Sequence, residues 1–247
     1  MTFFEAPLVA WVGLALLGAW LATDDTSLAQ TWFSQPLPAA VLAGLVLGDP
    51  GGALLPGLLL QLVVIGNLPV GASFRLDEPG ATVGIVGGSL LAGWNLPAGP
   101  VALASWTGTA AQSLGWLLVL TVAASLVGGW VVHGERQRRL GWMLDGYRSV
   151  RDGDLGRLER LHRRCLLVTL LRGGLLTLIW VLAAAGLGEL GGPARLARPL
   201  REALGLLPIM VPMLAVGSLA ERFGPRRAWP LVLAGAGVAF LVAWFGV

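Results

Sequence analysis

The chain has 247 residues, of which 55% are hydrophobic and only 13% are charged, and its net charge is +3. Soluble domains carry about 25% charged residues, so this composition excludes a soluble globular domain and predicts a helical membrane protein. The single cysteine, Cys165, excludes a disulfide scaffold, and the lack of lysine excludes Schiff-base and P-loop chemistry.

The first apolar run, 6–23, is uncharged and just long enough to cross a membrane once. Asp24 and Asp25 follow it and predict a turn that faces water. The next runs, 26–48 and 50–74, are also uncharged, but proline and glycine interrupt them too often for a straight helix. We therefore predict a re-entrant hairpin of two half-spans that meet at a tight turn, 48–52. Such a hairpin needs protein or a wet cavity around its backbone, which is typical of transporters.

Residues 79–132 contain no charged side chain, so this stretch is predicted to hold at least two passes, with a turn at 94–100. Further apolar runs cover 165–187, 203–220 and 228–247. The sequence thus predicts an all-α polytopic membrane protein with six or seven transmembrane helices plus one or two re-entrant hairpins, in a single membrane domain over 1–247.

One basic segment, 133–164, separates the two halves of the chain and carries nine arginines and five acidic residues. A basic loop between apolar runs predicts a cytoplasmic location. Leu155, Leu158 and Leu161 form one apolar stripe, which predicts an amphipathic helix on the membrane surface or on the inner face of the protein. A plain solvated connector is the alternative. The segment has no nucleic-acid-binding motif, so no nucleic-acid partner is expected.

Short motifs in the first two thirds of the chain resemble the IIC membrane component of the mannose, fructose and sorbose type of phosphotransferase system (PTS). The matching positions are Gln35 to Leu37, Gly44 to Asp49, Gly57 to Gln61, Gly66, Gly71, Ala72, Asp77, Gln112, Gly153 to Leu155, His162 and Arg172. The likeness covers roughly 36–176, and the order and spacing of these motifs are more specific than any one of them.

The resemblance implies a sugar-transport subunit in the bacterial inner (cytoplasmic) membrane. With a IID membrane subunit it would form the translocation path for a hexose-type sugar, which a IIB domain, supplied by IIA, phosphorylates. We expect no catalytic residue, no metal and no cofactor in this chain, and a homo-oligomer of IIC–IID units in the lipid bilayer. The alternative is a non-transporting membrane regulator or scaffold, because Gln61 and Pro69 replace a glutamate and an asparagine that many members carry.

Four polar residues in and after the hairpin are the expected sugar contacts: Gln61, Asn67, Ser73 and Asp77. Amides, hydroxyls and one acid suit hydroxyl recognition. The alternative for Gln61 and Asn67 is that they satisfy the hairpin backbone. Gln112 is a further candidate contact, although bonding between helices is the stronger interpretation of its polar helix face.

Arg172 lies seven residues into an apolar run. An intramembrane charge indicates function by default. Because the run begins so close to it, we favour the interpretation that its side chain reaches back to the membrane surface.

Overall fold

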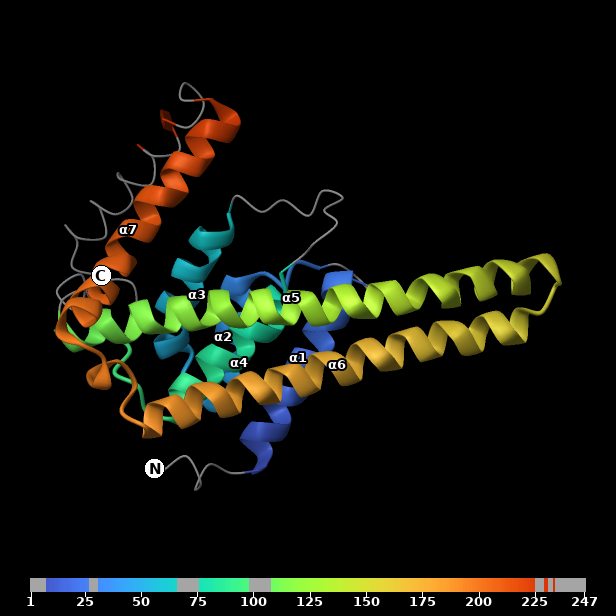
Figure 1. The fold of residues 1–247 in the computed structure, drawn as a ribbon, viewed down its shortest axis with the longest axis horizontal. Helices are drawn as coiled ribbons and strands as arrows, with labels where there is room; N and C mark the ends of the chain where they lie inside the picture. The colour runs from blue at the N-terminus through green and yellow to red at the C-terminus, as the bar shows by residue number, and fades with distance from the viewer. Residues whose placement is uncertain are drawn as a thin grey trace.

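The computed structural model describes residues 8–26, 31–65, 76–97 and 108–224, together with 229, 230 and 233. All regular structure among them is helical (Figure 1). The elements are α1 (Leu8–Thr26), α2 (Pro36–Leu47), α3 (Pro50–Val64), α4 (Glu78–Leu91), α5 (Gly108–Arg151), α6 (Leu155–Glu189), the short 3₁₀ helix η3 (Gly192–Arg195) and α7 (Arg198–Phe223).

The predicted turn between two short helices is confirmed. Gly48 ends α2 with a φ of 78°, and the Asp49 amide donates to the Gly44 carbonyl, 2.8 Å away. The Asp49 carboxylate then accepts from the Gly52 amide at the start of α3. At about 1.5 Å per residue, α2 and α3 reach roughly 18 and 22 Å, which is short of a bilayer. Their lengths fit half-spans.

Asp24 differs from expectation. It is buried, and its carboxylate accepts hydrogen bonds from the amide and hydroxyl of Thr31 and from the amide of Ser34. A buried carboxylate needs such donors, and the connection after α1 supplies them. Asp24 therefore holds the chain between α1 and α2, and it does not face water.

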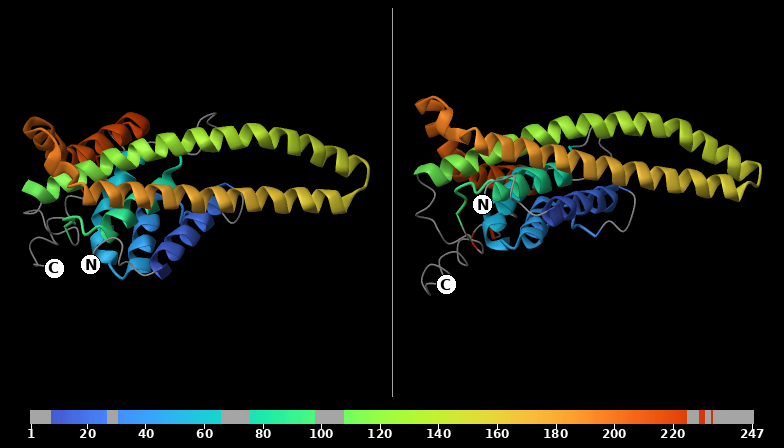
Figure 2. Two further views of the ribbon diagram at one scale, coloured as in Figure 1. Left: turned by 60° about the horizontal axis from the view of Figure 1, so that its bottom comes forward. Right: turned by 90° about the horizontal axis from the view of Figure 1, so that it is seen from below.

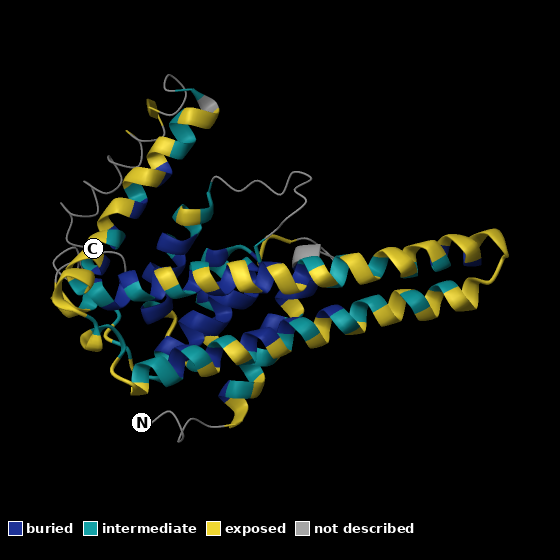
Figure 3. Cartoon of the chain, viewed as in Figure 1, coloured by how far each residue is buried: buried dark blue, intermediate teal, exposed yellow. Residues whose placement is uncertain are grey.

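Helix α4 lies in the centre of the body, with buried residues from Pro79 through Ser89. Its glycines allow close packing: a Cβ on Gly88 would lie 2.5 Å from the Val181 carbonyl oxygen of α6. Figure 3 shows that the buried residues gather here and thin out along the ends of α5 and α6. The helix is only 14 residues long, so the uncharged run that starts at Pro79 does not begin with a full-length span.

The segment 133–164 is helical, as expected, but it is not a separate surface helix. It forms the distal halves of α5 and α6, which run antiparallel and turn at Asp152 to Asp154 (Figure 2). Gly153, with a φ of 72°, makes that turn, and Asp154 accepts a hydrogen bond from the Arg157 amide at the start of α6. Figures 1 and 2 show this distal hairpin extending beyond the other helices rather than packing on the body.

Three described helices, α5, α6 and α7, are long and apolar enough to cross a membrane. The other apolar helices are shorter. Turns at Gly48 and Gly93 end α2 and α4, and α1 ends just after Asp24 and Asp25. The predicted six or seven full spans are therefore not confirmed. The last apolar run, 228–247, lies outside the described residues except at three positions.

Candidate functional site

Gln61, in the last turn of α3, bonds to the start of α2, at the ends of the two helices that lie away from the tight turn. Its side-chain oxygen accepts from the Leu37 amide at 3.3 Å, and its side-chain nitrogen donates to the Gln35 side-chain oxygen at 3.2 Å. The amide thus satisfies one of the free backbone donors in the first turn of α2. In this conformation Gln61 has a structural role, and its contact with a sugar stays a prediction. Two further expected contacts, Asn67 and Ser73, lie outside the described residues.

Asp77 directly precedes α4 and belongs to a buried ionic cluster, defined here as Asp77, Glu135, Arg139 and Arg172. The Arg172 Nε lies 2.5 Å from a Glu135 carboxylate oxygen, and its NH1 lies 3.8 Å from the Asp77 carboxylate. Arg139 pairs with Glu135 and donates to the Cys165 carbonyl at 3.0 Å. Two carboxylates and two guanidinium groups make the cluster neutral, as burial requires.

The favoured interpretation of Arg172 is wrong. Its side chain is only 9% exposed and lies between the carboxylates of Asp77 and Glu135. Helix α6 starts at Leu155, so Arg172 occupies the middle of a long helix and has no nearby end to reach. The backbone near Asp77 is also fixed, because its amide donates to the Ser125 carbonyl at 3.0 Å.

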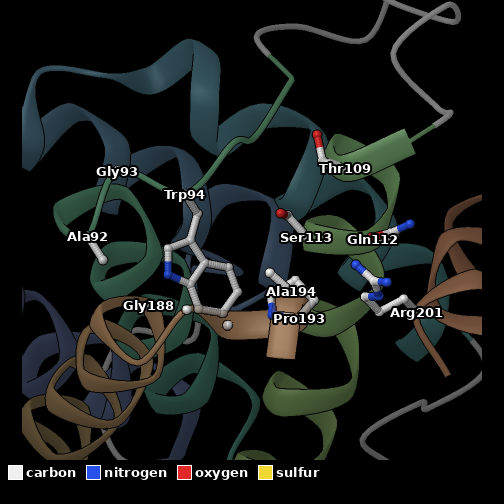
Figure 4. A pocket seen from close by; sticks show the side chains of 12 residues that line it. Ala92, Gly93, Trp94, Thr109, Gln112, Ser113, Gly188, Pro193, Ala194 and Arg201 are labelled. Carbon is white, nitrogen blue, oxygen red and sulfur yellow. The ribbon is translucent and has the colours of Figure 1, made fainter. Parts of the chain in front are cut away.

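Gln112 lies at the other end of α4, in a pocket of about 230 Å³. Four elements build the pocket, namely the residues after α4, the first turns of α5, the end of α6 with η3, and the start of α7 (Figure 4). Gly93, with a φ of 63°, ends α4 and places Trp94 against Gly188. A Cβ on Gly115 would overlap the Leu204 carbonyl, so this glycine lets α7 approach α5.

The pocket combines one aromatic ring with several uncharged polar groups and one cation. Figure 4 shows the Thr109 and Ser113 hydroxyls, the Gln112 amide and the Arg201 guanidinium around it, with the Trp94 indole opposite Arg201. None of the described residues that line it is acidic. This set can bind hydroxyl groups, but it offers no nucleophile beside a base. Among the described residues there is also no group of three metal-binding side chains.

The structure therefore divides the expected contacts between two places. Gln61 and Asp77 lie toward the start of α4, where Leu60, Glu78 and Ser125 line a small cavity, whereas Gln112 lies beyond its end. Fourteen residues of α4 separate the two ends by roughly 21 Å. Sequence reasoning missed Trp94 and Arg201. Local sequence patterns do not single them out, because their meeting depends on contacts between distant segments.

Comparison with known proteins identifies the family. The family model described as "PTS system sorbose-specific iic component" matches residues 9–243, so the chain belongs to this family. The fold is similar to that of a solved structure described only as a membrane protein, with a TM-score of 0.67 at 15% identity over 98% of this chain and 88% of that one. It is also similar to a chain in the cryoEM structure of the mannose transporter ManYZ with microcin E492, with a TM-score of 0.55 at 17% identity and the same two coverages. No curated protein matches the sequence.

Family membership and the long apolar helices make this chain a membrane component of PTS sugar transport. They confirm the resemblance on which the sequence-based expectations rest. The likeness to the two solved structures shows the shared fold.

Proposed function

We propose that this chain forms, with a IID membrane subunit, the translocation path for a hexose-type sugar in the bacterial inner membrane. A IIB domain would phosphorylate the sugar at the cytoplasmic side, supplied in turn by IIA. The observation that carries the proposal beyond the family is the pocket of Figure 4. Gln112 lines it together with the Trp94 indole and the Thr109 and Ser113 hydroxyls. The assembly would be a homo-oligomer of IIC–IID units.

The chemistry of the pocket suits a sugar. The Gln112 amide both donates and accepts, and the Thr109 and Ser113 hydroxyls do the same, as neighbouring ring hydroxyls require. The Trp94 ring offers an apolar surface for the C–H face of a pyranose. Asn95 donates to the Thr109 hydroxyl at 3.1 Å, which orients that side chain before a ligand arrives.

The position of His162 supports a transport role without phosphoryl transfer from this residue. His162 is exposed on the distal hairpin, and 26 residues of α6 separate it from Gly188 at the pocket. At about 1.5 Å per residue this is roughly 39 Å, far beyond the reach of a phosphoryl transfer. The phosphoryl group would therefore come from a partner protein and not from His162.

The test is the Gln112→Ala variant in the IIC–IID complex. Loss of this half-buried hydrogen-bonding group should weaken sugar binding by about 5- to 150-fold, for about 1–3 kcal/mol. Binding of hexoses to the purified complex and phosphoenolpyruvate-dependent uptake into vesicles are the measurements. The matched control is Gln137→Ala, the same exchange at an exposed position of the distal hairpin.

Unchanged binding and uptake in a folded Gln112→Ala complex would remove the pocket from the translocation path. If the wild-type complex binds no sugar and supports no uptake, the alternative of a non-transporting membrane regulator or scaffold is favoured instead.

A further inference from the structure

Arg201 is the one cation among the described residues that line the pocket, and no acidic residue joins it there. Its Nε atom is buried and has no hydrogen-bond partner within the part of the chain that the structure describes. The acid next in sequence, Glu202, is already paired with Arg198, whose Nε lies 2.7 Å from a Glu202 carboxylate oxygen. A half-buried guanidinium with an unpaired Nε donor and no carboxylate nearby would gain a charge-assisted hydrogen bond from an anionic ligand.

The place of Arg201 in its helix adds to this charge. It lies in the first turn of α7, where the backbone amides and the helix dipole already produce positive potential. A cation is unfavourable there, whereas a bound anion is favourable. Both the guanidinium and the helix terminus thus favour a negative group on the pocket side of α7.

Arg201 lies near Gln112, which we propose binds sugar hydroxyls. A Cβ on Gly205, one turn after Arg201, would lie 3.7 Å from the Gln112 Cγ, so the start of α7 packs on Gln112. Figure 4 shows Arg201 and Gln112 on the same side of the pocket, with Trp94 on the other side. One ligand of monosaccharide size could contact all of them.

We infer that this pocket takes an acidic sugar, a hexose derivative whose carboxylate pairs with Arg201 while its ring hydroxyls bond to Gln112 and Ser113. Because C6 of such a sugar is oxidised, one of its remaining hydroxyls would accept the phosphoryl group from IIB. The inference rests on the proposed function, because it names the class of sugar for the same site. The planar guanidinium matches a carboxylate with two parallel hydrogen bonds, and a hydroxymethyl group cannot replace that pair.

The test compares sugars that differ only at C6. Glucose, galactose and mannose are each paired with the corresponding uronate, and their binding to the purified IIC–IID complex is measured by calorimetry. For the pair of matching ring configuration we expect the uronate to bind about 10- to 150-fold more tightly, as for a hydrogen bond to a charged group. This preference should shrink as ionic strength rises, since part of it is electrostatic.

Two variants assign the preference to the residue. Arg201→Gln should weaken uronate binding by about 10- to 150-fold and so remove the uronate preference. Arg198→Gln is the control, because Arg198 lies one turn earlier on α7, is exposed, and already has an acidic partner. If Arg201→Gln does not yield a folded complex, Arg201→Lys should keep a reduced preference, because lysine keeps the charge without the planar fork.

The outcomes separate the two proposals. Neutral sugars that bind as tightly as their uronates, or a uronate preference that survives Arg201→Gln, would overturn the acidic-sugar inference and leave sugar transport standing. Displacement of the uronate by added phosphatidylglycerol would show that the anion site belongs to a lipid headgroup and would also overturn it. No binding of any sugar, together with no phosphoenolpyruvate-dependent uptake, would refute the proposed function itself.

Discussion

Removal of one charge from the buried ionic cluster should destabilise the protein strongly. Arg172→Met keeps the length and most of the volume of the side chain but deletes the guanidinium that lies between Glu135 and Asp77. The exposed fractions of the three side chains are 9%, 11% and 4%, so water cannot replace the lost partner. Arg139 still pairs with Glu135, but the cluster would then carry a net charge of −1.

The magnitude follows from the burial of the cluster. Breaking a buried ion pair by removing one partner costs about 3–5 kcal/mol, because an uncompensated charge remains inside. For a chain of this length each kcal/mol corresponds to roughly 2–4 °C in Tm, so we expect Tm to fall by about 6–20 °C. The double variant Arg172→Met with Asp77→Asn makes the cluster neutral again and should recover about 1–3 kcal/mol of the loss.

Thermal unfolding of the purified complex in detergent, followed by tryptophan fluorescence, measures these differences. The control is Arg163→Met, which removes the same group from an arginine that is 74% exposed and pairs with Glu159 one turn away. An exposed pair contributes about 0–1 kcal/mol, so Tm should change little. If Arg172→Met is as stable as Arg163→Met, or if the double variant is less stable than the single one, the cluster does not work as described.

Two further predictions concern the α2–α3 hairpin and the topology. Gln61→Ala removes both hydrogen bonds at the hairpin mouth and should lower the free energy of unfolding by about 1–3 kcal/mol, measured as a fall in Tm. Gln61→Glu, which retains the acceptor for the Leu37 amide, should lose less, and equal losses would contradict the assigned role. A cysteine at Asp152, which is 62% exposed at the tip of the distal hairpin, should react with an impermeant thiol reagent only from the cytoplasmic side in a Cys165→Ser background. Labelling from outside would reverse the topology; Ser149 is unsuitable for this test because its side chain is buried.

The features that the sequence predicts well are those encoded by neighbouring residues. The turn between α2 and α3 follows from Gly48, Asp49 and Pro50, which respectively end one helix, cap the next and begin it. The helical nature of the distal hairpin is equally local. Both could be predicted because each residue acts on a backbone group within one turn of itself.

One error has a local cause and the other comes from contacts between distant segments. The run that starts at Pro79 contains no charge, so hydropathy alone predicts a full span, yet Gly93 ends α4 after 14 residues. Arg172 is near the start of the apolar run but in the middle of α6, because the helix begins ten residues before that run, at Leu155, in a polar stretch that hydropathy ignores. Its two acidic partners lie 95 and 37 positions earlier in the sequence, and no local pattern indicates that they meet.

The partners of each charge, more than its presence in an apolar chain, indicate what it does. Arg172 has the stronger sequence signal for function, since it interrupts an apolar run, but the carboxylates of Glu135 and Asp77 neutralise it and give it a structural role. Arg201 has a weak sequence signal, since its neighbours in the sequence are also polar or charged, but within the described residues no acid balances it in the pocket. A buried charge with compensating partners favours the single arrangement of helices that brings those partners together. An uncompensated one at a pocket wall leaves part of its binding energy for a ligand, which is why Arg201, and not Arg172, is the arginine whose replacement should change the choice of sugar.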